Sequence, residues 1–281
     1  MSDTNDGKKI KSYMKRVTSH IKEVDENCEI YNYFPLCLGD THVVVISHNE
    51  IEVNKNCLKY LIENCEDSVK ITWLDNGSTD GTADFLKEEM NNHPNSKLFL
   101  SKTNLGVIGG RNLAVQLSEN DYGRGAPPEY TIFLDNDQYV GKGWLEQHLS
   151  FMNDNKYDVI GVEAWQMNDS FMPKYQASNL NESWSYLSGC ALTIRRNVID
   201  KIGWFDEMFN PAYFEDPDYC FRALDNGFKL GWNTKSKIVH MSHSTLGKFE
   251  NGYRHKLLVS NLAKFRKKWA GHDVPRIIQK V

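Results

Sequence analysis

The sequence lacks the long apolar runs that mark membrane-spanning and secreted proteins. None of its apolar runs reaches the roughly 18 residues that a membrane helix needs. Residues 1–16 are polar and rich in lysine, without the apolar stretch of a secretory signal. We therefore expect a globular protein of the cytoplasm.

Cysteine is scarce and unclustered. The chain has six cysteines, and no two of them form a Cys-x-x-Cys pair. With 281 residues, of which 40% are hydrophobic, the chain can bury a core without the help of disulfides. We therefore expect free thiols, and a zinc site built from these residues is the rarer alternative.

A large excess of positive charge is also absent. The 33 Lys and Arg residues are outnumbered by 37 acids, which gives no support for broad nucleic-acid binding. Residues 248–281 are the exception, with nine Lys or Arg against two acids. Basic and apolar residues are mixed in this tail: Lys264, Arg266, Lys267 and Lys268 with Leu262, Phe265 and Trp269. Such a helix suits either peripheral contact with a membrane surface or docking on the acidic remainder of the chain.

The first half of the chain alternates strands and helices. Strands are predicted at 42–47, 69–74, 97–100 and 130–134, with helices around 58–62 and at 80–90 and 109–118. The continuous apolar run at 42–47 is typical of a strand covered on both faces. This alternation predicts an α/β protein with a doubly wound, mainly parallel sheet, in which ligands bind at the carboxyl ends of the strands.

The second half is more mixed. Strands are predicted at 159–162, 187–194, 228–232 and 238–240, and helices at 217–226 and 253–270. A polar, lysine-rich segment precedes the first strand, and residues 11–26 in it have a helical pattern. We divide the chain into an N-terminal helical extension (1–38), a central domain (39–247) and a basic C-terminal helical tail (248–281).

Polar residues follow each of the first four predicted strands. The clusters are Ser47-His48-Asn49-Glu50, Asp75-Asn76 with the loop to Thr82, Asn104 to Asn112, and Asp135-Asn136-Asp137. Because the carboxyl ends of parallel strands lie at one edge of a sheet, these clusters predict a shared ligand site.

The Asp135-Asn136-Asp137 motif is the candidate metal site. On an extended strand the side chains at i and i+2 point to the same side, so we expect the two carboxylates to converge. Neighbouring carboxylates repel unless a cation lies between them, and oxygen ligands favour Mg²⁺ or Mn²⁺. The alternative is a turn that closes the strand, which is the commoner meaning of an isolated Asp-x-Asp.

The next two clusters suit a nucleotide. Asp75 lies at a strand end, where its carboxylate can accept a hydrogen bond from a nucleobase, although the same loop also has the residues of a helix cap. The glycines around Gly109 resemble a phosphate-binding loop without the Walker lysine or the Gly-x-Gly-x-x-Gly spacing. Arg111 suits a donor phosphate and an acid at the helix start equally well.

Acids and histidines gather late in the chain. Glu215, Asp216 and Asp218 fall at the start of a predicted helix, where they suit either capping or general base catalysis. We expect the helix N–H groups to keep Asp216 ionised at neutral pH and Asp218 to point elsewhere. His240 and His243 follow a short strand, where a histidine is either structural or a ligand.

In their order along the chain, these motifs resemble those of the family 2 glycosyltransferases, the inverting group with the GT-A nucleotide-diphospho-sugar transferase fold. The resemblance covers residues 42–243 and includes Asp-Asn-Gly-Ser-Thr-Asp-Gly-Thr, Asn-x-Gly with a later Arg-Asn, Asp-x-Asp, Gly-Trp-Phe-Asp-Glu, Glu-Asp-x-Asp and a late Val-His. The subgroup with the last acidic motifs includes many rhamnosyl-, galactofuranosyl- and N-acetylhexosaminyl-transferases. The central domain is thus similar to a GT-A domain.

The resemblance implies a role for each matched residue. Asp216 would be the catalytic base, while Asp137 and His240 would bind Mn²⁺ or Mg²⁺. The implied donor-binding residues are Ser47, Asn49, Glu50, Asp75, Asn76, Asn104, Gly109, Arg111, Asp135 and Asn136. Further candidates are Glu215 as a competing base, His243 as a competing ligand, and Trp204.

The implied reaction is a single displacement with inversion at the anomeric carbon. It moves a sugar from a nucleotide-diphospho-sugar, most often a UDP-sugar in this family, to a hydroxyl of a glycan, a protein or another acceptor. Several aromatic residues offer stacking surfaces for a sugar or belong to the core: Trp165, Tyr175, Trp184, Tyr186, Trp204 and Tyr213. The alternatives are a nucleotidyltransferase and an inactive sugar-nucleotide-binding protein.

Overall fold

The computed structural model describes residues 28–32, 40–66, 68–91, 95–119, 127–241 and 251–272. The helix expected at 11–26 and the candidate ligand His243 lie outside these residues. Within them, no helix is both long and apolar enough to cross a membrane.

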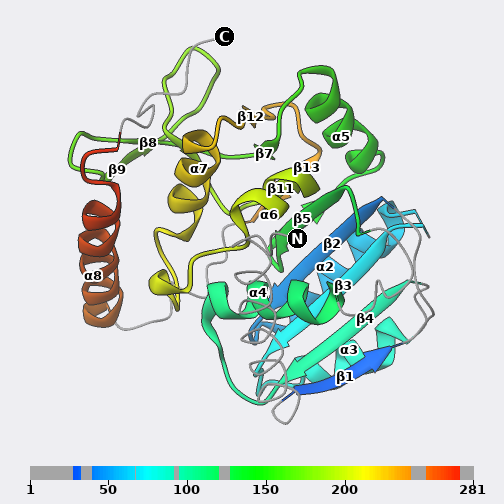
Figure 1. The fold of residues 1–281 in the computed structure, drawn as a ribbon. Coiled ribbons are helices and arrows are strands. Elements are labelled where there is room, and N and C mark those ends of the chain that lie inside the picture. Colours follow the sequence, from blue (N-terminus) through cyan, green and yellow to red (C-terminus); the bar gives the residue numbers. More distant parts are fainter. Residues whose placement is uncertain are drawn as a thin grey trace, which may run out of the picture.

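The main sheet has eight strands in the order β1-β4-β3-β2-β5-β11-β7-β12 (Figure 1). They are β1 (Cys28–Asn32), β2 (Thr41–Ser47), β3 (Lys70–Asn76), β4 (Ser96–Ser101), β5 (Tyr130–Asp135), β7 (Val159–Gly161), β11 (Leu192–Arg195) and β12 (Leu230–Trp232). Strands β4, β3, β2 and β5 are parallel, whereas β11 runs antiparallel to both β5 and β7. The predicted doubly wound sheet with a mixed second half is confirmed.

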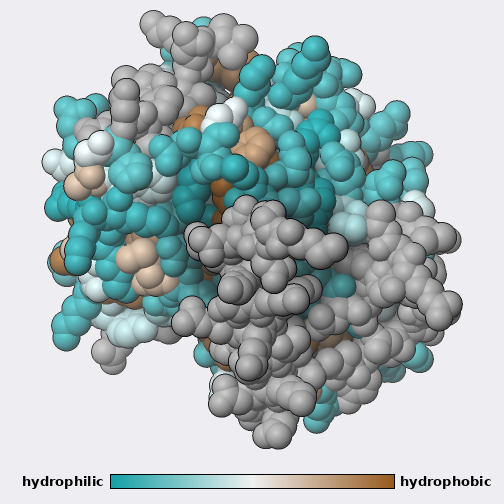
Figure 2. Space-filling model, in the orientation of Figure 1, coloured by the Kyte–Doolittle hydropathy of each residue, from teal (hydrophilic) through white to brown (hydrophobic). Residues whose placement is uncertain are grey.

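Helices cover both faces of this sheet (Figure 1). They are α2 (Ile51–Asn64), α3 (Thr82–Met90), α4 (Gly106–Glu119), α5 (Trp144–Asp154), α6 (Arg196–Ile202), α7 (Glu215–Asp225) and α8 (Asn251–Trp269), with a short 3-10 helix η1 (Glu207–Phe209). Successive residues of β2 point to opposite faces, so Val44 and Ile46 belong to one hydrophobic cluster and Val43 and Val45 to the other. On the face of the molecule seen in Figure 2, hydrophobic residues show only in small areas among hydrophilic ones.

Two small sheets complete the fold. One has the order β10-β8-β9, formed by β10 (Tyr186–Leu187), β8 (Ala164–Met167) and β9 (Pro173–Gln176). The other pairs β13 (Ile238–His240) with β6 (Gln138–Val140) in antiparallel register, so that His240 lies opposite Gln138. This pairing brings the late histidine next to the Asp135-Asn136-Asp137 motif.

Strand β1 corrects the prediction for residues 1–38. Its five residues form an edge strand antiparallel to β4, in a segment where we expected only a helical extension. The helical expectation is wrong for these residues, because a short edge strand bordered by polar sequence carries little periodic signal of its own. The division of the whole chain into three parts stays a prediction.

Helix α8 docks on the body of the protein. Leu262, Phe265 and Trp269 are buried in the same cluster as Val44 and Ile46. The Lys268 ammonium lies 2.7 Å from an Asp206 oxygen and 2.8 Å from an Asp218 oxygen. Lys264 donates to the backbone oxygen of Met208 at 2.7 Å. The docked alternative for the basic tail is therefore observed, and membrane contact stays a prediction.

Candidate active site

A cavity of about 880 Å³ lies where the four parallel strands end. The predicted site residues that line it are Ser47, Asn76, Asn104, Arg111, Asp135, Asn136, Asp137, Glu215, Asp216 and His240. The structure therefore brings together residues that are more than 190 positions apart in the sequence. Asn49, Glu50, Asp75, Gly109 and Trp204 are not among its lining residues.

The Asp135-Asn136-Asp137 motif differs from the expected geometry. Strand β5 ends at Asp135, and the next two residues form a turn before β6 begins. The strand alternation that predicted converging carboxylates therefore does not extend to Asp137, and that premise was wrong. The Asn136 amide donates to the side-chain oxygen of Asn54 at 2.8 Å and ties the turn to α2.

Asp135 pairs with a buried arginine. Nη2 of Arg111 donates to Oδ1 of Asp135 at 2.6 Å and to the backbone oxygen of Gly189 at 3.2 Å. The guanidinium also lies over the Phe133 and Phe205 rings. Because a buried arginine needs a counter-charge, the acid-pairing alternative for Arg111 is observed. Its partner stands at the end of β5, not at the helix start, and a donor contact stays a prediction.

Asp137 faces His240 at the wall of the cavity. Nε2 of His240 lies 3.4 Å from Oδ1 of Asp137, and Nδ1 lies 2.8 Å from Oε1 of Glu163. Hydrogen bonds with Asp137, Cys190 and Glu163 raise the pKa of His240 far above that of a free imidazole. The ring is therefore held from both edges.

The Asp137 and His240 pair fits a divalent cation. Two neighbouring ligands of an octahedral ion at about 2.1 Å stand roughly 3 Å apart. The observed separation of 3.4 Å between a carboxylate oxygen and an imidazole nitrogen is close to this value. Asp135 stands beside the turn with a third of its side chain exposed to the cavity.

Two adjacent carboxylates stand at the start of α7. Asp216 Oδ2 accepts from the Gly189 N–H at 3.2 Å, while Oε2 of the buried Glu215 has no hydrogen-bond partner among the described residues. Burial and then the Glu215 charge raise the pKa of Asp216 well above its usual value. Burial likewise raises the pKa of Glu215. Burial therefore opposes the ionisation of Asp216 that we expected the helix N-terminus to favour, and the ionised state of Asp216 at neutral pH stays a prediction.

Asp218 has a structural role in holding α8 against α7. Its fully buried carboxylate pairs with Arg222 at 2.9 Å, with Lys268 at 2.8 Å and with Nε1 of Trp269 at 3.0 Å. It therefore points away from the cavity, as predicted, and anchors α8.

The first two polar clusters bond to each other. Asp75 accepts from the hydroxyl and the backbone N–H of Ser78, and Ser47 Oγ lies 3.5 Å from its Oδ1. Asn49 Oδ1 accepts from the Thr79 N–H at 2.8 Å, and Glu50 precedes α2 with a positive φ of 66°. Burial raises the pKa of Asp75. These contacts give the loop its shape, and the nucleobase role of Asp75 stays a prediction.

The glycines near Gly109 do not form a phosphate loop. Gly109 and Gly110 lie inside α4, and a Cβ at Gly110 would stand 2.3 Å from Cδ1 of Ile46. The small residues therefore allow α4 to approach β2 closely, and the loop interpretation was wrong. Asn104 accepts from the Asn76 amide at 3.1 Å and from the Gly106 N–H at 2.8 Å, at the cavity edge.

The aromatic candidates divide between cavity and core. Trp165, Tyr186 and Tyr213 line the cavity, with Tyr253 of α8 beside them. Trp204 packs edge-on against Phe133 with ring centroids 5.9 Å apart. Trp184 is buried, and the Tyr175 hydroxyl donates to the Ser183 backbone at 3.3 Å.

Two residues beside the site were missed by the sequence analysis. Glu163 and Cys190 line the cavity and lie next to His240. Glu163 follows the apolar run of β7, and an acid between two apolar segments was the available signal. Cys190 carries no local signal, because its position depends on long-range pairing of β11.

The chain is similar in sequence to known glycosyltransferases. The model of a family described as glycosyl transferase family 2 matches residues 42–217. An uncharacterized glycosyltransferase of Haemophilus influenzae is 26% identical over 40% of this chain and 42% of its own length. Glycosyltransferase AglE of Haloferax volcanii is 24% identical over 67% of this chain and 62% of its own length. The chain thus spans less than two thirds of either relative.

The fold has solved counterparts. The mannosyltransferase PcManGT from Pyrobaculum calidifontis, in complex with GDP-Man and Mn²⁺, superposes with a TM-score of 0.61 at 15% identity, over 84% of this chain and 66% of that chain. This likeness confirms the GT-A fold. Since the family model spans well over half of the 281 residues, the chain belongs to glycosyl transferase family 2.

Proposed function

We propose that this chain is a metal-dependent inverting glycosyltransferase, which moves a sugar from a nucleotide diphosphate donor to an acceptor hydroxyl. One observation carries the proposal: a single cavity joins the Asp137 and His240 pair to the Glu215 and Asp216 pair. The first pair suits a cation and the second suits a proton acceptor. Together they provide for the two ends of a transfer between oxygens, the leaving diphosphate and the attacking hydroxyl.

Asp137 and His240 would hold Mn²⁺ or Mg²⁺ at the donor end. When bound, the cation neutralises the negative charge of the departing diphosphate. Glu163 accepts the proton of Nδ1 and thereby turns Nε2 toward Asp137. The PcManGT complex with GDP-Man and Mn²⁺ supports this assignment by its fold. UDP-sugars are the first donors to test.

Asp216 would act on the acceptor. Its carboxylate takes the proton of the acceptor hydroxyl, while the acceptor oxygen attacks the anomeric carbon from the face opposite the nucleotide. The bond between that carbon and the diphosphate oxygen breaks, and the configuration inverts. Burial that raises the pKa of Asp216 makes the ionised form a stronger proton acceptor. Glu215 is the competing base, since it shares the cavity wall.

The acceptor would enter past the aromatic side of the cavity. Trp165 and Tyr213 are half-buried in the cavity lining and would offer rings on which a sugar can stack, whereas Tyr186 is largely buried. Leu257 and Leu258 of α8 line the same region. The tail helix therefore contributes to acceptor selection in addition to its packing role.

A panel of nucleotide sugars with Mn²⁺ tests the proposal. We expect one donor to raise the melting temperature in the presence of the metal and to be slowly hydrolysed to a nucleoside diphosphate. Release of pyrophosphate would instead indicate a nucleotidyltransferase. Stabilisation without turnover, with any acceptor class, would indicate a protein that only binds sugar nucleotides.

A further inference from the structure

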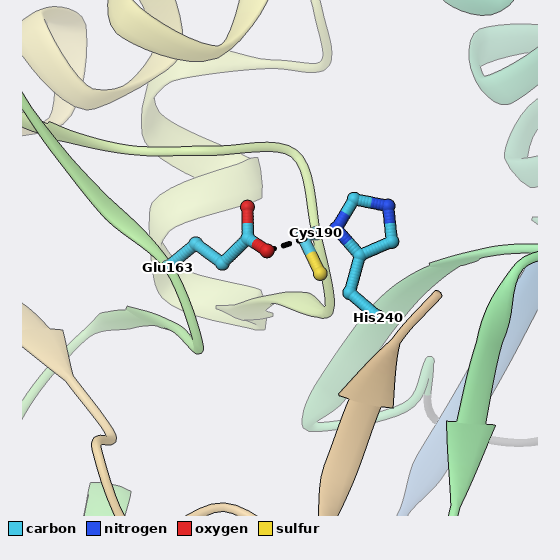
Figure 3. A group of neighbouring side chains, drawn as sticks. All are labelled: Glu163, Cys190 and His240. Atoms are coloured by element: carbon cyan, nitrogen blue, oxygen red, sulfur yellow. Dashed lines mark hydrogen bonds and ion pairs between the residues drawn. The ribbon is translucent and has the colours of Figure 1, made fainter. Parts of the chain in front are cut away.

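Three side chains with metal-binding atoms meet behind His240. Glu163 follows β7, Cys190 precedes β11, and His240 ends β13. Figure 3 shows the carboxylate, the thiol and the imidazole turned toward one another. One oxygen, one sulfur and one nitrogen from these residues all lie within 4.8 Å of each other, and the Oε1 to Nδ1 distance is 2.8 Å.

The 2.8 Å pair and the 4.8 Å limit lie on either side of the ligand separations in a tetrahedral zinc site. Zinc binds nitrogen, oxygen and sulfur at about 2.0 to 2.3 Å, so its ligand atoms stand roughly 3.3 to 3.8 Å apart. Thiolate and imidazole favour Zn²⁺ over Mg²⁺ or Mn²⁺, which prefer oxygen ligands.

We propose that Glu163, Cys190 and His240 form a second metal site, which binds a thiophilic divalent cation such as Zn²⁺. Three protein ligands leave a fourth position for water, and all three residues line the cavity, so the ion has an entry path. Ser188 donates its hydroxyl to the second oxygen of Glu163 at 3.2 Å and orients the carboxylate. On binding, the Cys190 thiol releases its proton to solvent and coordinates as thiolate.

The zinc site uses a different ring nitrogen from the donor cation. Glu163 stands 2.8 Å from Nδ1, whereas Asp137 stands 3.4 Å from Nε2 on the opposite edge. A neutral imidazole that coordinates through Nδ1 carries its proton on Nε2, which then cannot bind a metal beside Asp137. Zinc therefore withdraws His240 from the donor cation and inhibits transfer. This consequence rests on the proposed function, while zinc binding itself does not.

Binding of zinc alone is the direct test. Zn²⁺ affinity is measured by competition with a chromogenic chelator, and Co²⁺ is added separately as a spectroscopic probe of sulfur ligation. We expect a thiolate-to-cobalt charge-transfer band in the wild-type chain. Cys190→Ser should remove the band, and both Cys190→Ser and Glu163→Gln should weaken Zn²⁺ binding by more than about tenfold. Cys65→Ser, at a cysteine outside the cavity lining, is the matched control and should bind like wild type.

The competing outcomes are distinct. An unchanged Zn²⁺ affinity and cobalt band in Cys190→Ser would overturn the site. If Cys190→Ser does not fold, as judged by its melting curve, Glu163→Gln with the wild-type cobalt band decides the question. Zn²⁺ should also weaken Mn²⁺-dependent UDP binding in wild type and in Cys65→Ser. Failure of Mn²⁺ to support UDP binding in the zinc-free wild type would count against the proposed function and leave the zinc titration intact.

Discussion

Asp216 and Glu215 are neighbours whose roles a pair of variants can separate. Asp216→Asn keeps the shape of the side chain and removes its basicity. We expect sugar transfer to fall by about 10² to 10⁴-fold, because a positioned general base contributes that much. The variant should stay folded and should bind donor and metal like wild type. The measurement is the initial rate of transfer at saturating donor.

A different result would move the role of general base from Asp216 to Glu215. Near-normal transfer by Asp216→Asn, with Glu215→Gln inactive, would assign the base to Glu215. Asp218→Asn is not a neutral control, since Asp218 is fully buried between Arg222 and Lys268. Asp225→Asn is a suitable one, because this acid at the end of α7 is outside the cavity lining and 43% of its side chain is exposed.

Asp137 carries the second prediction for single residues. We expect UDP binding to strengthen with Mn²⁺ and to lose most of this gain in Asp137→Ala, because only one protein ligand then remains beside the cation. Calorimetry with and without a chelator is the measurement. Asp154→Ala, in an exposed position on α5, is the control. Equal UDP affinity with and without Mn²⁺ in the wild type would rule out the metal assignment.

Helix α8 leads to a prediction about stability. Phe265 is fully buried and meets Phe171, Phe214 and Phe221 with ring centroids between 5.2 and 5.4 Å apart. Phe265→Ala should lower the free energy of unfolding by about 3 to 5 kcal/mol, because it removes a large apolar side chain from a packed cluster. Val259→Ala, at a position that is 50% exposed on the same helix, should change it by less than about 0.5 kcal/mol. Urea unfolding measures both, and equal effects would contradict the docked position of α8.

Elements that depend on local sequence were predicted, whereas features that depend on contacts distant in the sequence were not. The apolar run of β2 marks a two-sided strand by itself, because Val43 to Ile46 bury both faces. The edge strand β1 depends on its partner β4, and the sequence of five residues does not reveal that pairing. Helix α4 was predicted, yet its glycines were misinterpreted, because the close approach of Gly110 to Ile46 is a tertiary contact.

In the molecule as a whole, contacts between residues far apart in the sequence also determine the candidate site, and the sequence does not reveal them. Motif order identified part of the cavity lining, including Asp137 and His240, but not the partners of these residues. The pairing of Arg111 with Asp135 joins α4 to β5, and Glu163 reaches His240 from the connection between β7 and β8. The pKa of Asp216 also depends on the whole fold, since burial by surrounding elements opposes the local helix dipole. Local patterns therefore pointed to residues that the fold gathers around one cavity, and tertiary packing determined the surroundings of each.

Stability toward acid should depend on a histidine that is not among the residues lining the cavity. His148 is buried between Thr193, whose hydroxyl lies 2.9 Å from Nε2, and Asn233, whose amide lies 3.1 Å from Nδ1. Burial lowers its pKa to about 4. An unfolded histidine takes up its proton near pH 6.5, so between these values the unfolded chain binds more protons than the folded one. The stability contributed by His148 is therefore complete above about pH 6.5 and is lost as the pH falls.

The expected change in the free energy of unfolding follows from the same difference in proton binding between the folded and unfolded chain. One proton of difference corresponds to about 1.4 kcal/mol per pH unit, so His148 should cost about 2 kcal/mol between pH 6.5 and 5. The buried carboxyls act in the opposite direction, because the raised pKa of Asp216 and Glu215 favours the folded state at low pH. The informative quantity is therefore the difference between variants and wild type. Unfolding in urea at pH 7.5 and pH 5 should show a smaller acid-induced loss in His148→Gln, whereas His255→Gln, at an exposed position on α8, should behave like wild type. An equal loss in His148→Gln and wild type would show that His148 does not stay neutral in the folded protein.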